Sequence, residues 1–373
     1  MKRKARSMVA ASLAVLLSGL VMSVGLTRGA GHLPKSVADL ARLPERMWTR
    51  FLPPRVKRNA RLAGLTGPER TAVDVLSPQI DGLVVWSSNR SGNHELYLLD
   101  LRARSVRLLT RHPNVDFFSR FSPDGRRVLF LRSQREWVSA RDKSAWDLMV
   151  VNADGTGEEP LARGVYHPTW LADGSGILFE RGTQFVRYDL VTRRESVLLD
   201  VAKAFPGVGE MGDVELSPDG RRLAFGLRGT FSGAFGLSGR FSGAVVCDLD
   251  ARALAILTRE QACQTTWAPD GGRVLWMETG GQGGTRVMTG APDGTDRRVL
   301  MDLPGARSHE YFPKLSNDGR WLVWAASAEG HEHDRADYEI FLWRAGTPWG
   351  QAVQLTHHVG NDQWPDLWIR PAR

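Results

Sequence analysis

The stretch FSPDG at residues 121–125 decides the fold, because the same short pattern returns along the chain. Its later copies are WLADG (170–174), LSPDG (216–220), WAPDG (267–271) and LSNDG (315–319). The five turn aspartates are separated by 49, 46, 51 and 48 residues. A period of about 40–50 residues that contains several short strands is typical of a β-propeller. The repeat therefore predicts an all-β propeller.

Each copy of the turn is followed by the same order of elements, as the unit after Asp124 illustrates. Apolar and β-branched residues mark strands at 127–133, 146–153 and 158–163, and the segment before the turn supplies a fourth strand. Proline presets φ and glycine accepts a positive φ, so the Pro-Asp-Gly sequence suits a tight reversal. We expect four-stranded antiparallel blades.

The two ends of the chain together complete the count of blades. Six segments match the second strand of the unit and six match the third, yet the first unit, residues 82–110, has no Asp-Gly strand in front of it. At the far end, DQWPDLW (362–368) aligns with EYFPKLS (310–316), the strand before a turn. We expect a six-bladed propeller over residues 81–373, with the C-terminal strand completing the first blade and removing its open edge.

Two further motifs carry a family resemblance. Ser-Pro-Asp-Gly stands at 122–125 and 217–220, and HELYLLD (94–100) and YEIFLW (338–343) occupy third strands. These pieces resemble the TolB-like, WD40-like propellers of bacterial periplasms, over about residues 80–369. TolB itself carries a separate folded domain before its propeller, whereas only about fifty residues stand there in this chain. The resemblance is therefore to the propeller family and not to TolB itself.

The N-terminal residues 1–26 indicate export. Four basic residues between Lys2 and Arg6 precede an uncharged apolar run at 8–26. This pattern is typical of a secretory signal peptide, which is the favoured interpretation, or of an uncleaved membrane anchor. Both place the rest of the chain outside the inner membrane, so we expect a periplasmic or other extracytoplasmic location.

Charge excludes one class of partner. The chain has a formal net charge of +8 and a pI near 9.8. Four bases belong to the leader and residues 27–75 hold ten bases against four acids, which leaves 35 bases and 37 acids in the propeller. A near-neutral ring offers no stripe for phosphates, so no nucleic acid is expected as a partner.

The basic excess belongs to a linker at residues 27–80. Within it, residues 37–52 place apolar side chains on one helical face, which predicts a short amphipathic helix. That helix either packs on the propeller or lies on anionic lipid as part of a membrane tether. Both interpretations stay open.

Cys247 and Cys263 are the only cysteines. An exported protein can oxidise such a pair to a disulfide. Because the two residues fall on a third strand and on the first strand of the next blade, two buried thiols are the favoured interpretation.

The unrepeated loops supply the candidate site. Loops joining strands two and three, and loops leading to the next blade, share the face opposite the Asp-Gly turns. Seven of the eight propeller histidines fall there, and His167 falls just inside a strand. They concentrate at 308–312, 331–337 and 356–364, around the last blade and the C-terminal strand. The predicted binding residues are His309, Glu310, His331, Glu332, His333, Asp334, Asp337, His357, His358, Asp362 and Trp364.

Imidazoles and carboxylates in this number can hold a divalent metal such as zinc or manganese, with His331, His333 and His358 as the candidate ligands. A bound metal could activate water, and the TolB-like fold includes metal-dependent polysaccharide lyases. Loop histidines and aspartates also bond to backbone groups, and this structural or partner-binding role is favoured. On that interpretation there is no catalytic residue and no cofactor.

Two other features have more than one interpretation. The glycine-rich FSGAFGLSGRFSGA (231–244) fits a flexible lid or an unpacked hairpin extension, and the hairpin is favoured. Most of the 13 tryptophans fall on strands and should fill the space between blades. Trp364 and Trp368 are the candidates for stacking on a ligand.

The sequence thus predicts an exported, monomeric propeller scaffold. It would bind an envelope protein or a cell-wall component through the loop face beside the C-terminal strand. The alternative is a metal-dependent lyase or hydrolase acting on an acidic saccharide or peptide at the mouth of the channel.

Overall fold

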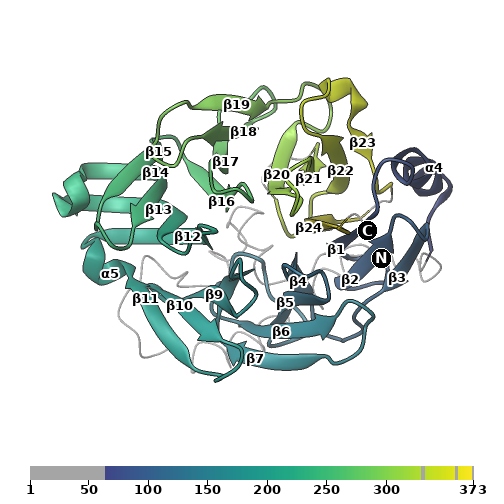
Figure 1. Cartoon of the computed structure of the whole chain (residues 1–373), viewed down its shortest axis with the longest axis horizontal. Helices are drawn as coiled ribbons and strands as arrows, with labels where there is room; N and C mark the ends of the chain where they lie inside the picture. Colours follow the sequence, from purple (N-terminus) through teal and green to yellow (C-terminus); the bar gives the residue numbers. More distant parts are fainter. Residues whose placement is uncertain (1–63, 329–331, 358–359, 372–373) are drawn as a thin grey trace, which may run out of the picture. The chain divides into compact units, whose positions relative to one another are not determined.

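The computed structural model describes residues 64–328, 332–357 and 360–371. Within these ranges the chain forms six four-stranded antiparallel sheets arranged around a common centre (Figure 1). We name them blades A to F in their order around the ring, where A contains β24 and β1–β3, B contains β4–β7, and the later blades follow in sequence. The predicted six-bladed propeller is confirmed.

Each blade contributes one strand to each of four concentric positions. The inner strands are β24 (Asp362–Ile369), β4 (Asp116–Phe121), β8 (Tyr166–Trp170), β12 (Val208–Leu216), β16 (Ala262–Trp267) and β20 (His309–Leu315). The second strands are β1 (Gly82–Ser88), β5 (Arg127–Ser133), β9 (Gly176–Arg181), β13 (Arg222–Ser232), β17 (Val274–Thr279) and β21 (Trp321–Ser327). The third strands are β2 (Glu95–Asp100), β6 (Trp146–Asn152), β10 (Gln184–Asp189), β14 (Ser238–Asp248), β18 (Thr285–Gly290) and β22 (Glu339–Arg344). The outer strands are β3 (Ser105–Leu108), β7 (Glu159–Arg163), β11 (Glu195–Asp200), β15 (Leu254–Thr258), β19 (Arg298–Met301) and β23 (Val353–Gln354).

The C-terminal strand closes the ring as predicted. Strand β24 pairs antiparallel with β1, from Gly82 opposite Ile369 to Ser88 opposite Asp362. Blade A is therefore assembled from both ends of the propeller, and the inner edge of β1 is covered.

The second strands form the centre of the packing. All seven residues of β1 and all seven of β21 are buried, because neighbouring blades cover both faces of each sheet. Trp86, Trp146, Trp276 and Trp324 are among the largest fully buried side chains. For these four residues, the predicted role of strand tryptophans as filling between blades is confirmed.

The Asp-Gly turns satisfy their own polar groups. In the first copy, Ser122 Oγ donates to Asp124 Oδ1 (2.6 Å) and accepts from the backbone N–H of Arg127 (2.9 Å). Gly125 has φ +70°, which only glycine adopts at little cost. The repeated motif is thus a structural turn.

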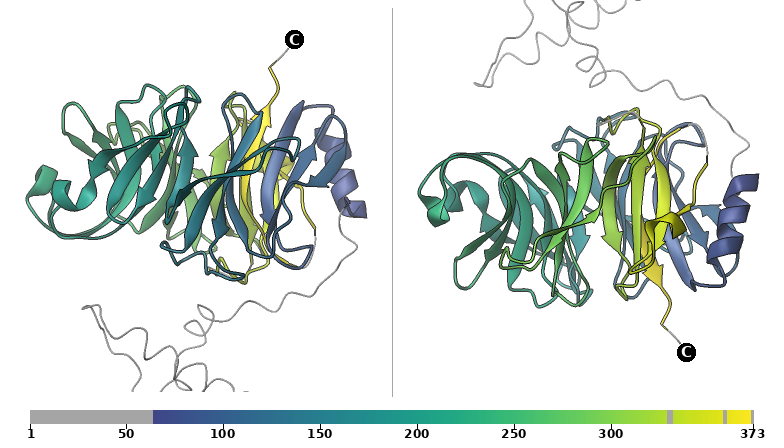
Figure 2. Two further views of the ribbon diagram at one scale, coloured as in Figure 1. Left: turned by 90° about the horizontal axis from the view of Figure 1, so that it is seen from below. Right: turned by 90° about the horizontal axis from the view of Figure 1, so that it is seen from above.

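A helix that the sequence analysis did not predict precedes blade A. Helix α4 (Gly67–Leu76) begins at a capping box in which Thr66 and Glu69 bond to each other's backbone N–H. It buries Ala72, Val73 and Leu76 and lies at the outer side of the propeller (Figure 2). The leader (1–26) and the predicted amphipathic helix (37–52) lie outside the described residues. No helix in the described part of the chain is long and apolar enough to span a membrane.

The glycine-rich segment is a hairpin, because β13 and β14 pair along their whole length up to Ser232 opposite Ser238. Its tip is packed rather than unpacked: Phe231, Leu237 and Phe241 are each at most 3% exposed. Phe235, in the 3-10 turn η1 (Ala234–Gly236), stacks on Phe205 at 4.7 Å, just after α5 (Val201–Ala204). A second 3-10 turn, η2, spans Trp349–Gln351. Cys247 and Cys263 are free thiols, as favoured, but only Cys247 is buried, and Cys263 is partly exposed.

Candidate functional site

All six inner strands carry a β-bulge at the same place. The register shifts in each strand, and one non-glycine residue there adopts a positive φ between 42° and 59°. These bulge residues are Phe118, His167, Asp213, Gln264, Phe312 and Trp364. Such a conformation costs about 1–3 kcal/mol per residue, and bulges commonly redirect a side chain next to a functional site. Six of them in register mark the centre of the ring.

The bulge residues line a cavity in the central channel. It is open to solvent at one end, and all six bulge residues contribute to its wall. The remaining lining residues follow the bulges toward the Asp-Gly turns: Arg120, Pro168, Thr169, Val214, Glu215, Thr265, Thr266, Pro313 and Lys314. We call this cavity the channel pocket.

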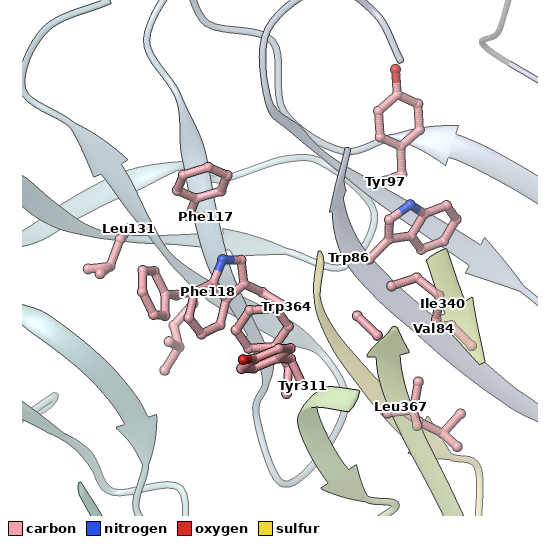
Figure 3. Packing of buried hydrophobic residues seen from close by; sticks show 14 of the residues in the cluster. Val84, Trp86, Tyr97, Phe117, Phe118, Leu131, Tyr311, Ile340, Trp364 and Leu367 are labelled. Atoms are coloured by element: carbon pink, nitrogen blue, oxygen red, sulfur yellow. The ribbon is translucent and has the colours of Figure 1, made fainter. Parts of the chain in front are cut away.

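One wall of the channel pocket is aromatic. The ring of Trp364 lies 3.7 Å from that of Phe118 and 3.8 Å from that of Phe312, measured between centroids. Figure 3 shows Trp364 beside Phe118 in this cluster. The indole N–H of Trp364 is buried and has no hydrogen-bond acceptor among the described residues. Trp364, predicted as a binding residue, is thus placed in the wall of a cavity.

The opposite wall is charged, and His167 lies at its centre. Its Nδ1 is 2.5 Å from Glu180 Oε1 and its Nε2 is 2.9 Å from Asp213 Oδ1. Burial alone would lower the pKa of His167, but the two carboxylates outweigh it and raise that pKa to about 9. His167 is therefore an imidazolium at neutral pH, with one carboxylate beside each of its ring nitrogens.

This pairing predicts a stability change with pH. The pKa of His167 rises from 6.5 to about 9 on folding, so its stabilisation is complete below pH 6.5 and is lost as the pH rises through 9. Over that pH range, we expect the free energy of unfolding of the wild type to fall by about 3 kcal/mol relative to that of His167→Gln. Urea unfolding of both proteins between about pH 6 and pH 10 measures this difference. A constant difference across the range would contradict the assignment.

A second ion pair spans blade E near the mouth. Lys314 Nζ contacts the carboxylate of Glu215 and donates to Thr266 Oγ1 (2.9 Å). Glu215 Oε2 also accepts from the backbone N–H of Trp267 (2.8 Å). Burial would raise the pKa of Glu215, but Lys314 and these hydrogen bonds keep it below its ordinary value. The carboxylate of Glu215 therefore stays charged at neutral pH.

The other mouth of the channel is covered by the loop between β5 and β6, residues 134–145, which we call the crossing loop. It starts in blade B, yet Ala140 N–H donates to Asp334 of blade F (2.9 Å) and Lys143 Nζ donates to the Met211 carbonyl of blade D (2.5 Å). Blade D is two positions from blade B in one direction around the ring, and blade F is two positions from it in the other direction. A loop that touches both must pass over the channel.

Two further contacts hold the crossing loop in place. Lys143 Nζ lies 3.3 Å from Glu180 Oε2, and Tyr166 Oη donates to the Ala140 carbonyl. Gly212 permits this approach, because a Cβ there would lie 2.8 Å from Lys143 Nζ. The loop is thus joined to the charged wall of the channel pocket.

The carboxylates predicted as binding residues on the loop face form ion pairs and hydrogen bonds with other residues of the propeller. Asp362 pairs with Arg90 (3.1 Å), Glu332 with Arg141 (2.6 Å) and Asp337 with Arg307 (3.1 Å). Asp334 accepts from Ser139 Oγ (2.5 Å) and Ala140 N–H of the crossing loop. Glu310 accepts from the Leu303 N–H (2.9 Å), and burial raises its pKa to about 7. These side chains connect strands and blades.

The predicted histidines do not form one cluster within the described residues. His333 is buried, with its ring 4.9 Å from that of Tyr311 and 6.1 Å from that of Trp364. His357 Nε2 is 3.1 Å from the Gln354 carbonyl, and partial burial lowers the pKa of His309. His331 and His358 lie outside the described residues. In the part of the chain that the structure describes, no three His, Cys, Asp or Glu side chains are arranged to hold a metal.

The channel pocket was not predicted from the sequence, although a signal for it exists there. Each bulge residue before an Asp-Gly turn stands six positions ahead of the turn aspartate, as His167 does before Asp173. Aligning the repeats on their aspartates would have grouped these residues. His167 was instead set apart from the other histidines because it falls inside a strand.

The architecture defines the class of protein: a six-bladed propeller closed by its C-terminal strand, with a pocket in the channel. No protein-family model and no curated protein matches the sequence. A putative TolB from Agrobacterium tumefaciens has a similar structure, with a TM-score of 0.54 and 16% identity, over 77% of this chain and 99% of that chain. The fold is therefore TolB-like, as the motifs predicted.

Two further structures match with lower scores. TolB from Acinetobacter baumannii gives a TM-score of 0.47 at 14% identity, over 79% of this chain and 85% of that one. An oligogalacturonate lyase in complex with manganese gives 0.45 at 17% identity, over 73% and 72%. At these identities the likeness is one of fold.

Proposed function

We propose that this protein is an extracytoplasmic binding scaffold that receives part of an envelope protein or cell-wall component in the channel pocket beside the C-terminal strand. One observation carries the proposal: six strained bulge residues in register build a cavity with an aromatic wall facing a charged wall. Concave sites that present placed polar groups beside apolar side chains are typical ligand sites. The leader supports export.

We propose the channel, rather than the loop side chains, as the place of contact. The loop carboxylates are committed to links between strands and between blades, whereas Trp364, Glu215 and Lys314 line the cavity. The near-neutral ring supports a protein or cell-wall partner over a nucleic acid. We propose that the propeller acts as a monomer.

A pull-down from envelope extract tests this function. The double variant Glu215→Gln/Lys314→Met removes both charges of the mouth pair together, so neither is left buried and unpaired. We expect it to reduce capture by about tenfold or more, which corresponds to about 1.4 kcal/mol of binding free energy. Glu159→Gln/Arg193→Met removes an exposed pair between outer parts of blades B and C, and should capture as the wild type does.

Two results would overturn the proposal. Equal capture by the wild type and by Glu215→Gln/Lys314→Met would exclude the channel pocket. Loss of capture with His331→Ala or His358→Ala alone would return the site to the loop face. Stoichiometric zinc or manganese that disappears with those same variants would support the alternative, a metal-dependent lyase or hydrolase acting on an acidic saccharide or peptide.

A further inference from the structure

Arg120 differs from the other charged groups of the channel pocket. His167 is held by Glu180 and Asp213, and Lys314 is held by Glu215. Arg120 also lines the pocket, yet among the described residues no carboxylate oxygen lies within 4.0 Å of its guanidinium. Its Nη1 donates to the Ser119 carbonyl (2.9 Å) and the Pro365 carbonyl (3.4 Å). Within the described part of the chain, Nε and Nη2 have no acceptor.

The neighbouring carboxyl, Asp366, does not neutralise Arg120 by an ion pair. Its Oδ2 accepts from the Phe121 N–H (2.8 Å) and its Oδ1 from the Leu367 N–H (2.9 Å). Burial raises the pKa of Asp366, although the nearby Arg120 and Lys314 oppose the rise. The guanidinium therefore retains free donors at the pocket.

Arg120 is placed next to the aromatic wall. It follows the bulge residue Phe118 by two positions on β4, and the Pro365 carbonyl that it contacts adjoins Trp364 of β24. A guanidinium presents parallel donors that match a carboxylate in a bidentate pair. Beside it, Phe118 and Trp364 line the pocket with apolar ring atoms, although they are only 3% and 4% exposed.

In the described part of the chain, the crossing loop lies over one mouth of the channel, so we infer that such a ligand uses the other mouth. The crossing loop covers the face opposite the turns through contacts to blades C, D and F. The pocket lining runs from the bulges toward the Asp-Gly turns and includes no residue of the crossing loop. Access is therefore from the Asp-Gly-turn face.

We propose that the channel pocket binds a carboxylate-bearing ligand that enters between the Asp-Gly turns and pairs with Arg120 while its apolar part packs on Phe118 and Trp364. This inference rests on the proposed binding function and names the ligand chemistry and the route of entry. A peptide C-terminus and a uronic acid both present this group.

Two matched pairs of probes test the chemistry by NMR titration: N-acetyl-phenylalanine against its amide, and glucuronic acid against glucose. We expect the acidic member of one pair to bind at least about tenfold more tightly than its neutral partner. The pair that shows the difference identifies a peptide-like or a sugar-like source. The difference should vanish in Arg120→Gln and remain in Arg126→Gln, which changes an exposed arginine of the adjacent turn.

Equal affinities within both pairs, or failure of both acids to bind, would overturn carboxylate recognition. If Arg120→Gln and Arg126→Gln reduced the difference in affinity between acidic and neutral probes equally, the role of Arg120 would be overturned. The pull-down distinguishes these failures from failure of the scaffold function, because capture that still depends on Glu215 and Lys314 would leave the binding function standing.

Blocking each face in turn tests the route of entry. Ala172, in the second Asp-Gly turn, and Glu136, in the crossing loop, are both exposed. Each would be changed to Cys in a protein with Cys247→Ala and Cys263→Ala, and then coupled to a polyethylene glycol chain. We expect coupling at position 172 to lower the affinity for the acidic probe by about tenfold or more, and coupling at position 136 to leave that affinity unchanged. The reverse result would overturn entry from the turn face.

Discussion

Deletion of residues 362–373 is expected to abolish folding of the propeller. It removes β24, and with it the buried side chains of Trp364, Leu367 and Ile369 and the Asp362–Arg90 pair. Each buried side chain contributes about 1.5–3 kcal/mol to the free energy of unfolding. Together with the ion pair, the loss therefore approaches the total free energy of unfolding of a typical domain, which is about 5–15 kcal/mol. Circular dichroism and size-exclusion chromatography should show an unfolded or aggregated chain.

The matched control is deletion of residues 371–373. This shorter truncation retains Arg370, which donates to Asp81 Oδ1 and Asp100 Oδ2 (both 2.6 Å). It should leave the melting temperature within a few degrees of the wild type. A folded monomer after the longer deletion would show that blade A does not need its C-terminal strand.

Arg90→Met is expected to lower the free energy of unfolding by about 3–5 kcal/mol, because it leaves two buried carboxylates without a counter-ion. Arg90 Nη2 lies 2.9 Å from Glu69 of α4 and 3.1 Å from Asp362 of β24, and all three side chains are at most 1% exposed. The guanidinium thus joins the helix, blade A and the C-terminal strand. Urea unfolding measures the loss.

An exposed arginine paired with the same helix provides the control. Arg104 and Asp74 lie 2.9 Å apart with side chains 56% and 61% exposed, so Arg104→Met should change the free energy of unfolding by about 0–1 kcal/mol. Adding Glu69→Gln and Asp362→Asn to Arg90→Met should recover part of the loss, because no uncompensated charge remains. Equal effects of Arg90→Met and Arg104→Met would refute the buried link.

Local chemistry allowed most of the fold to be predicted. The Asp-Gly turns are satisfied within five residues, so the motif reports its own structure wherever it occurs. The alignment of 362–368 with 310–316 predicted the closing strand for the same reason. Helix α4 was missed although Thr66, Pro68 and Glu69 form a recognisable helix start, because the whole segment was assigned to a basic linker.

The candidate site was less predictable, because its residues acquire their roles through contacts between distant blades. Asp334 stands in a polar stretch that suggests an exposed binding residue. Its carboxylate instead accepts hydrogen bonds from Ser139 and Ala140, which lie 195 and 194 residues earlier in the chain. His167 was set aside, yet Glu180 and Asp213 of two blades make it the centre of the charged wall. Proximity of this kind depends on ring closure and on loop paths.

The number of blades, the turns and the partner of the first blade's open edge are predictable from the sequence, because each rests on hydrogen bonds and side-chain alternation within one repeat or between similar repeats. The side chains that face the channel are known only from the folded ring, since a bulge shifts the alternation of every inner strand at one residue. The folded ring also decides which mouth is covered, because the crossing loop's contacts lie in blades C, D and F, far from it in sequence.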